Sequence, residues 1–170
     1  MTAALRARVA HELAEPEPAK PVVLAIDPGS VQSAFVIWAD RVVDFGIWLN
    51  ETLVAYLRRQ HTSDVVVIEK VESYGMAVGA EVFETVRWAG RFEEASQPRP
   101  VVYLPRREIK LSLCGSPRAK DSNIRQALLD RFGGSSAVGR KAHPGPLYGI
   151  SRDVWAALAV AVTYTQGAHP

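Results

Sequence analysis

Apolar runs alternate with polar breaks along the chain, and the first run is the most informative. Residues 22–27 read VVLAID and are followed directly by Pro28 and Gly29. A continuous apolar run of this length is typical of a strand buried on both faces, which usually lies at the centre of a mixed α/β sheet. Because the Pro-Gly pair turns the chain sharply, we expect Asp27 at the tip of a rigid strand.

A hairpin and a helix are predicted next. Residues 33–38 and 41–48 are β-rich and flank a tight polar turn at 39–40, which indicates two antiparallel strands. Residues 51–60 carry apolar side chains at helical spacing. The sheet is therefore expected to begin with three strands in antiparallel sequence.

The second buried strand, residues 64–69, also ends on a carboxylate, that of Glu69. The helix before this strand is expected to be a crossover connection, and a crossover helix normally joins parallel neighbours. The strand is then expected beside the first strand and parallel to it. Asp27 and Glu69 would stand at the same end of the sheet.

The remainder of the chain predicts further helices, one more strand and a loop. Residues 135–149 are rich in Gly, Ser, Pro and basic residues, which favours a mobile loop. The other predicted elements are a buried strand at 101–104 and helices at 78–95, from Pro105 onward, at 124–132 and at 153–165. The pattern as a whole predicts an α/β fold with a mixed five-stranded sheet flanked by helices.

Composition places few further limits on the class of protein. The 170 residues are 48% hydrophobic and 22% charged, which is ordinary for a soluble globular protein. The single cysteine, Cys114, excludes an internal disulfide and a cysteine-based zinc site and suits a reducing, cytoplasmic setting. No apolar run approaches membrane-spanning length, so we expect no membrane partner.

One domain is predicted for most of the chain. Residues 1–20 alternate Ala, Arg and Glu and lack the apolar core of a signal peptide, which predicts a disordered or loosely helical leader. Residues 21–166 are then a single domain, and residues 167–170 are a tail. No internal repeat is visible in the sequence.

A third acid accompanies the two strand-end carboxylates. Asp153 stands at the start of the last predicted helix. Carboxylates are the hard oxygen ligands that Mg²⁺ and Mn²⁺ prefer, and two such ions can activate water and stabilise the leaving oxygen in phosphodiester cleavage. Each acid also has a simpler interpretation, since Asp27 could form the turn and Asp153 could cap the helix. The combination with Glu69 is what favours a metal site.

Three motifs carry a family resemblance. They are Asp27-Pro28-Gly29-Ser30 after a buried strand, Val66-Val67-Ile68-Glu69 at the end of another, and the run DVWAALAVA that begins at Asp153. Together they resemble the signature of RuvC-type Holliday junction resolvases, within the ribonuclease H-like nuclease superfamily. The resemblance covers about residues 22–165 and implies a ribonuclease H-like fold. The divergence of the sequence suggests a phage or other mobile-element member, acting in the cytoplasm of a bacterial host.

The resemblance implies a dimeric, Mg²⁺-dependent endonuclease that places paired symmetric nicks in four-way or other branched DNA. It implies two divalent ions in each site, with Mn²⁺ able to replace Mg²⁺. Asp27, Glu69 and Asp153 match the family's catalytic and metal-binding carboxylates, and Lys120 matches a lysine near the scissile phosphate. The family's fourth carboxylate falls on Ala156 in this chain, so one ligand is absent. Glu72 or a water could substitute for it.

Positive charge is concentrated in residues 99–141, whose only acids are Glu108, Asp121 and Asp130. Binding to a phosphate backbone requires such a concentration, although a solvated helix face would also account for it. Tyr74 is placed where an aromatic ring could stack on an unpaired base, or pack in the protein. The predicted DNA-binding residues are Arg106, Arg107, Lys110, Arg118, Lys120, Arg125 and Tyr74.

Two other function classes fit parts of the sequence. A junction-binding protein with weak or lost cleavage would explain Ala156. An actin-like or sugar-kinase-like ATP-binding fold also opens with a strand that ends in an acid and a glycine turn, but it needs a second phosphate-binding glycine loop and a longer chain, and the sequence shows neither. The helix at 78–95 is a candidate dimer surface, and burial within one chain explains its apolar side almost equally well.

Overall fold

The apolar run that precedes Asp27 forms β1 (Val23–Asp27), the central strand of a five-stranded sheet with the order β3-β2-β1-β4-β5. The computed structural model describes residues 20–59, 62–73 and 75–167. Residues 1–19 of the predicted leader and residues 168–170 of the predicted tail lie outside the described residues. Residues 23–26 are fully buried, so the prediction of a strand covered on both faces is confirmed.

The antiparallel half of the sheet is the predicted hairpin. β2 (Gln32–Trp38) pairs antiparallel with β1 on one side and with β3 (Val42–Leu49) on the other. The turn between β2 and β3 contains Asp40 at a φ of 59°, a left-handed conformation that Asp adopts more readily than most residues. The sheet therefore begins with three antiparallel strands, as predicted.

The parallel half brings the strand-end acids to one edge. β4 (Val65–Lys70) pairs parallel with β1, and Ile26 lies opposite Ile68 in the register. Asp27 and Glu69, which follow these two residues, therefore lie at the same end of adjacent strands, and the prediction is confirmed. β5 (Val101–Pro105) continues the parallel pairing beyond β4 and ends at this edge too.

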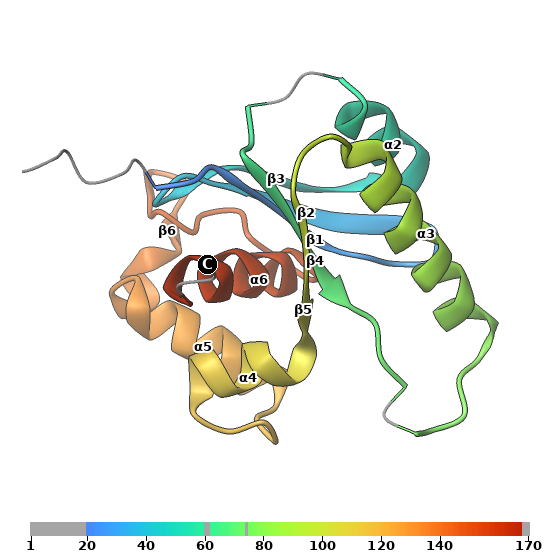
Figure 1. Cartoon of the computed structure of the whole chain (residues 1–170). Helices are drawn as coiled ribbons and strands as arrows, with labels where there is room; N and C mark the ends of the chain where they lie inside the picture. Colours follow the sequence, from blue (N-terminus) through green and yellow to red (C-terminus); the bar gives the residue numbers. More distant parts are fainter. Residues whose placement is uncertain (1–19, 60–61, 74, 168–170) are drawn as a thin grey trace, which may run out of the picture.

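Helices cover both faces of the sheet (Figure 1). α2 (Asn50–Leu57) and α3 (Ala80–Ser96) lie on one face, and the other face carries α4 (Arg106–Cys114), α5 (Asp121–Arg131) and α6 (Val154–Gln166). Side chains alternate between the two layers, because successive strand residues point to opposite faces. Leu24 packs with Phe92 of α3, whereas Val23 packs with Leu158 of α6.

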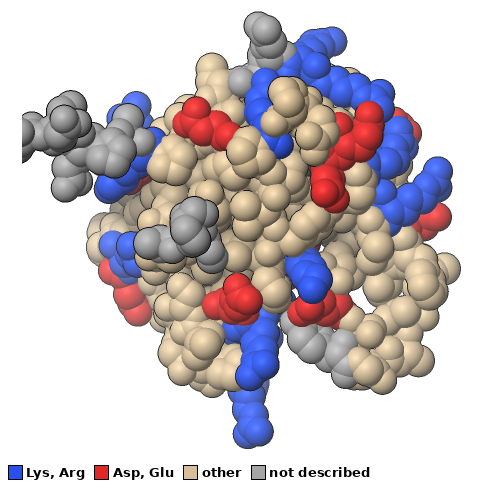
Figure 2. Space-filling model, viewed as in Figure 1, with Lys and Arg blue, Asp and Glu red and all other residues tan. Residues whose placement is uncertain are grey.

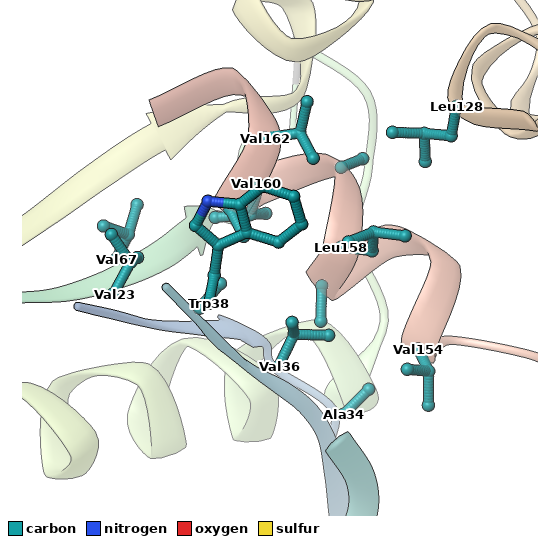
Figure 3. Packing of buried hydrophobic residues seen from close by; sticks show 14 of the residues in the cluster. Val23, Ala34, Val36, Trp38, Val67, Leu128, Val154, Leu158, Val160 and Val162 are labelled. Carbon is teal, nitrogen blue, oxygen red and sulfur yellow. The ribbon is translucent and has the colours of Figure 1, made fainter. Parts of the chain in front are cut away.

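α6 is held against the sheet by a dense apolar contact. In Figure 3 the Trp38 ring of β2 points toward α6 and lies beside Val160 and Val162. Leu158 and Val160 are fully buried, and burying a side chain of this size contributes about 1.5–3 kcal/mol. Several such contacts fix the helix in place, and with it the position of Asp153 at its start.

The segment at 135–149, predicted to be a mobile loop, contains short regular elements that the sequence pattern did not predict, and its mobility stays a prediction. It forms a 3₁₀ helix (Gly134–Ala137) and two short paired strands, β6 (Gly139–Arg140) and β7 (His143–Pro144). Leu147 is fully buried, and its N–H donates to the carbonyl oxygen of Ala137 at 2.8 Å. The glycines that suggested mobility allow the backbone segments to pack closely, because an added Cβ at Gly145 would collide with the backbone of Ala137.

Among the helices of the described part of the chain, none is both long and apolar enough to cross a membrane. The apolar residues of α3 divide between the core and the surface. Ala89 and Phe92 are buried against the sheet, whereas the side chains of Phe83 and Val86 are exposed. Burial within one chain therefore accounts for part of the apolar side of α3, and a dimer surface on the rest stays a prediction.

Candidate active site

The three predicted carboxylates line one cavity at the edge of the sheet. Asp27 ends β1, Glu69 is the fifth residue of β4, and Asp153 directly precedes α6. Their cavity has a volume of about 320 Å³ and includes Arg106, Asp121 and Ala156 in its lining. The fold thus brings together acids that are up to 126 positions apart in the sequence, from Asp27 to Asp153.

A buried polar network holds the turn after Asp27. The Gly29 N–H donates to Oγ of Ser33 at 3.1 Å, the Ser33 hydroxyl donates to Oδ1 of Asn50 at 2.7 Å, and Nδ2 of Asn50 donates to the Gly29 carbonyl oxygen at 2.9 Å. Ser33 and Asn50 are each 1% exposed. Gly29 is required because an added Cβ would collide with the backbone oxygen of Gln32. This network was not predictable from the sequence, in which its only signal is two polar residues, Ser33 and Asn50, at the ends of apolar segments.

Burial makes the charged forms of both strand-end acids costly. Burial, together with the charges of Glu69 and Asp153, raises the pKa of Asp27 to about 8, although the charge of Arg106 opposes the rise. Burial also raises the pKa of Glu69, although the charge and the hydrogen bond of Arg106 lower it in part. Perturbed carboxylates in a cavity are typical of functional sites, since a cation placed there would stabilise their charged forms.

Arg106, one of the predicted DNA-binding residues, is engaged with the acids themselves. Its Nη1 donates to Oε2 of Glu69 at 2.8 Å, and its Nη2 donates to Oδ1 of Asp121 at 2.7 Å. The hydrogen bond from Arg106 is the main reason that the pKa of Asp121 is lowered. The guanidinium therefore bridges two carboxylates at the wall of the cavity.

The start of α6 presents Asp153 to the cavity. Within the described residues, its side chain makes no capping hydrogen bond to the helix, so the helix-cap interpretation does not hold. Arg152 precedes it at a φ of 48°, a left-handed conformation that is uncommon for a residue with a long side chain. Trp155 is partly buried. It packs against the core and also lines the cavity, where the guanidinium of Arg125 lies 5.1 Å from its ring centre.

A fourth carboxylate does reach the cavity, but from a different helix. Ala156 lines the cavity as the sequence predicts, and Asp121, in the first turn of α5, lines it as well. In the sequence, Asp121 is recognisable only as one of three acids within the basic segment. Glu72, the predicted substitute, forms an ion pair with Lys70 at 3.0 Å and lines an adjoining cavity with Asp27 and Glu69.

The donor chemistry of the cavity fits a hard divalent ion. Four carboxylates line it, and two of them, those of Asp27 and Glu69, have a raised pKa that a nearby cation would lower. The carboxylates as they stand do not form a complete coordination shell. In the described part of the chain, no three Asp, Glu, His or Cys side chains are arranged to hold a metal ion.

Most of the remaining predicted DNA-binding residues lie beside this cavity. Arg107, Lys110 and Arg118 line a neighbouring cavity of about 480 Å³ together with Arg106. Lys120 is exposed just before α5 and does not line the carboxylate cavity. On the face in Figure 2, Lys and Arg side chains stand out at the lower edge, where α4 and α5 lie, and along the upper right. Tyr74 lies outside the described residues.

The sheet order, the parallel strands that carry the acids and the helices on both faces define a ribonuclease H-like fold. Comparison with solved structures shows which members of this fold class the chain is similar to. RuvC from Thermus thermophilus superposes with a TM-score of 0.61 and 18% identity, over 84% of this chain and 92% of that one. T. thermophilus RuvC in complex with a Holliday junction substrate gives a TM-score of 0.63 and 19% identity over the same shares. The fold is therefore RuvC-like.

Neither protein-family models nor curated protein sequences match this chain. The likeness thus lies in the fold rather than in the sequence as a whole, and a phage origin stays a prediction.

Proposed function

We propose that this protein is a metal-dependent endonuclease that resolves four-way or other branched DNA by paired nicks. One observation carries the proposal, namely that Asp27, Glu69 and Asp153 converge on a single cavity next to a cavity lined by cations. The complex of the similar T. thermophilus protein with a Holliday junction supports branched DNA as the substrate class.

Asp27, Glu69 and Asp153 would hold the divalent ions, with Mg²⁺ or Mn²⁺ favoured by the all-oxygen donor set. The chemistry that such ions supply is the activation of water and the stabilisation of the leaving oxygen in phosphodiester hydrolysis. The buried network behind Gly29 keeps Asp27 in position. A preorganised site of this kind needs little rearrangement during the reaction.

The basic residues would bind the DNA backbone. Arg107, Lys110 and Arg118 share a cavity in which a phosphate can meet several donors at once. Lys120 stands at the start of α5, next to Asp121 of the carboxylate cavity, and would approach the phosphate from that side. Paired nicks call for two such sites, which a homodimer would supply.

Cleavage of a synthetic four-way junction tests the proposal. We expect the wild-type protein to nick the junction in Mg²⁺ or Mn²⁺ but not in EDTA, and to leave a linear duplex of the same sequence intact. Asp27→Asn should abolish the nicks while junction binding persists, because it removes a metal ligand and no DNA contact.

The absence of a carboxylate at Ala156 favours a second candidate, a junction-binding protein with weak or lost cleavage. Tight junction binding by the wild type without nicks in either metal would establish this second function in place of the first. Loss of both binding and cleavage would exclude both functions.

A further inference from the structure

The carboxylate cavity contains a cation of its own. The side chain of Arg106 is only 22% exposed, and that of Glu69, 2.8 Å away, is 13% exposed. Separating such a pair is costly, because each partner would be left as an uncompensated buried charge. The contact is therefore a stable part of the site, unlike the exposed ion pairs elsewhere on the surface.

The fold places this guanidinium in the row of strand-end acids. Arg106 follows directly on β5, and β5 is the parallel neighbour of β4, with Leu104 opposite Glu69 in the register. Asp121, 76% exposed, binds the second nitrogen of the same guanidinium. A positive charge thus stands at the edge where Asp27 and Glu69 end their strands.

The charges around the cavity limit how many ions it can attract. The formal charge of its lining is −1, because four carboxylates are offset by three guanidinium groups. These groups belong to Asp27, Glu69, Asp121, Asp153, Arg106, Arg125 and Arg152. A second divalent ion near Glu69 would lie beside the fixed positive charge of Arg106, and Ala156 offers no carboxylate to offset the repulsion.

We infer that Arg106 takes the place of one of the two divalent ions, so that the site binds a single ion. Asp27 and Asp153 hold that ion, while Arg106 neutralises Glu69 and offers its charge to the DNA phosphate, as a guanidinium can. This inference rests on the proposed function, and it predicts one ion per site where the family resemblance implies two.

Binding of Mn²⁺ to the full-length protein, followed by electron paramagnetic resonance and by calorimetry, tests the inference without a cleavage assay. We expect the wild type to bind one Mn²⁺ per chain. Arg106→Gln should bind a second ion, or bind the first at least ten-fold more tightly, because a positive charge next to the carboxylates is gone. Arg106→Lys should keep the wild-type stoichiometry, because it keeps the charge.

Arg107→Gln is the matched control. It removes the same charge from the next residue, which is exposed and lines the neighbouring cavities instead, so Mn²⁺ binding should stay as in the wild type. A second readout is the dependence of junction cleavage on Mn²⁺ concentration, which should be first order for the wild type and second order for Arg106→Gln.

The possible results of these Mn²⁺-binding experiments test this inference and the proposed function separately. Two ions bound to the wild type would overturn the inference whatever the variants do, and so would an Arg106→Gln variant that binds no more ions and no more tightly than the wild type. The proposed function would survive both results. A wild type that binds no Mn²⁺ would overturn the proposed function as well.

Discussion

The fold buries the carboxylate of Asp27, where its charged form is costly. Burial and the charges of Glu69 and Asp153 together raise its pKa to about 8. Taken alone in the sequence, an Asp before Pro-Gly is more often a turn residue than a metal ligand. Its surroundings in the structure favour the ligand, because a buried carboxylate among other acids destabilises the fold unless a cation accompanies it.

This cost predicts how the stability of the metal-free protein depends on pH. Folded Asp27 keeps its proton up to a pH of about 8, whereas its ordinary pKa is 3.8. Folding therefore takes up a proton between these values, and stability falls as the pH rises through the interval. Asp27→Asn cannot lose a proton, so it should be more stable than the wild type by a margin that grows by on the order of 1 kcal/mol per pH unit.

Urea unfolding in EDTA at several pH values would measure this margin, which should level off above about pH 8. Asp130→Asn on the exposed side of α5 controls for the removal of one carboxylate from the surface. A margin that is the same at pH 5 and pH 8 would show that Asp27 titrates normally.

At the scale of elements, the strand ends and helix starts determine where each functional group lies. Asp27 and Glu69 were predictable because buried strands have a recognisable pattern and parallel neighbours end together. The positions of Arg106 and Asp121 relative to Glu69 were not predictable. Arg106 follows β5, and Asp121 begins α5. Their meeting at Glu69 depends on how α4 and α5 pack, and no periodicity in the sequence encodes that packing.

The turn after β1 can be tested through Asn50, the first residue of α2. Asn50→Ala leaves the Ser33 hydroxyl without its acceptor and the Gly29 carbonyl oxygen without its donor. Because these groups are buried, we expect a loss of about 1–3 kcal/mol in the free energy of unfolding. Junction cleavage should fall as well, since Asp27 would be held less firmly.

Thr52→Ala is the matched control for this prediction. It lies two residues further along the same helix but is exposed, so its effect on stability should stay within about 0.5 kcal/mol. Equal losses for Asn50→Ala and Thr52→Ala would mean that the network contributes nothing specific.

At the scale of the whole molecule, the formal charge is only +2, so attraction to DNA depends on where the cations lie. Arg107, Lys110 and Arg118 line one cavity next to the carboxylates, whereas Arg87 on α3 pairs with Glu84 across the sheet from them. A protein with this distribution is expected to bind DNA through one side.

Salt dependence of junction binding, measured by fluorescence anisotropy in EDTA, tests this asymmetry. Each phosphate contact contributes about 0.9 to the slope of log affinity against log salt concentration. The double variant Arg107→Gln, Lys110→Gln should therefore lower the slope by about 2 and weaken binding at physiological salt. Arg87→Gln should change neither quantity, and an unchanged slope for the double variant would place the DNA elsewhere.

The sequence by itself determined the order of the elements, the central strand and the shared edge of Asp27 and Glu69. Those features follow from local apolar patterns and from the rule that a crossover joins parallel strands. The same local reasoning did not predict the short elements within residues 135–149, because Gly and Pro occur both in mobile loops and in tightly packed turns, and contacts such as that of Leu147 are not visible in the sequence.

Only the tertiary structure decided which charges meet in the cavity. It brought Asp121 to the cavity lined by Ala156, joined Arg106 to Glu69 and placed Trp155 at the cavity wall. These relations depend on the angles at which α4, α5 and α6 pack on the sheet. Such angles arise from many side-chain contacts at once, and no single stretch of sequence carries them.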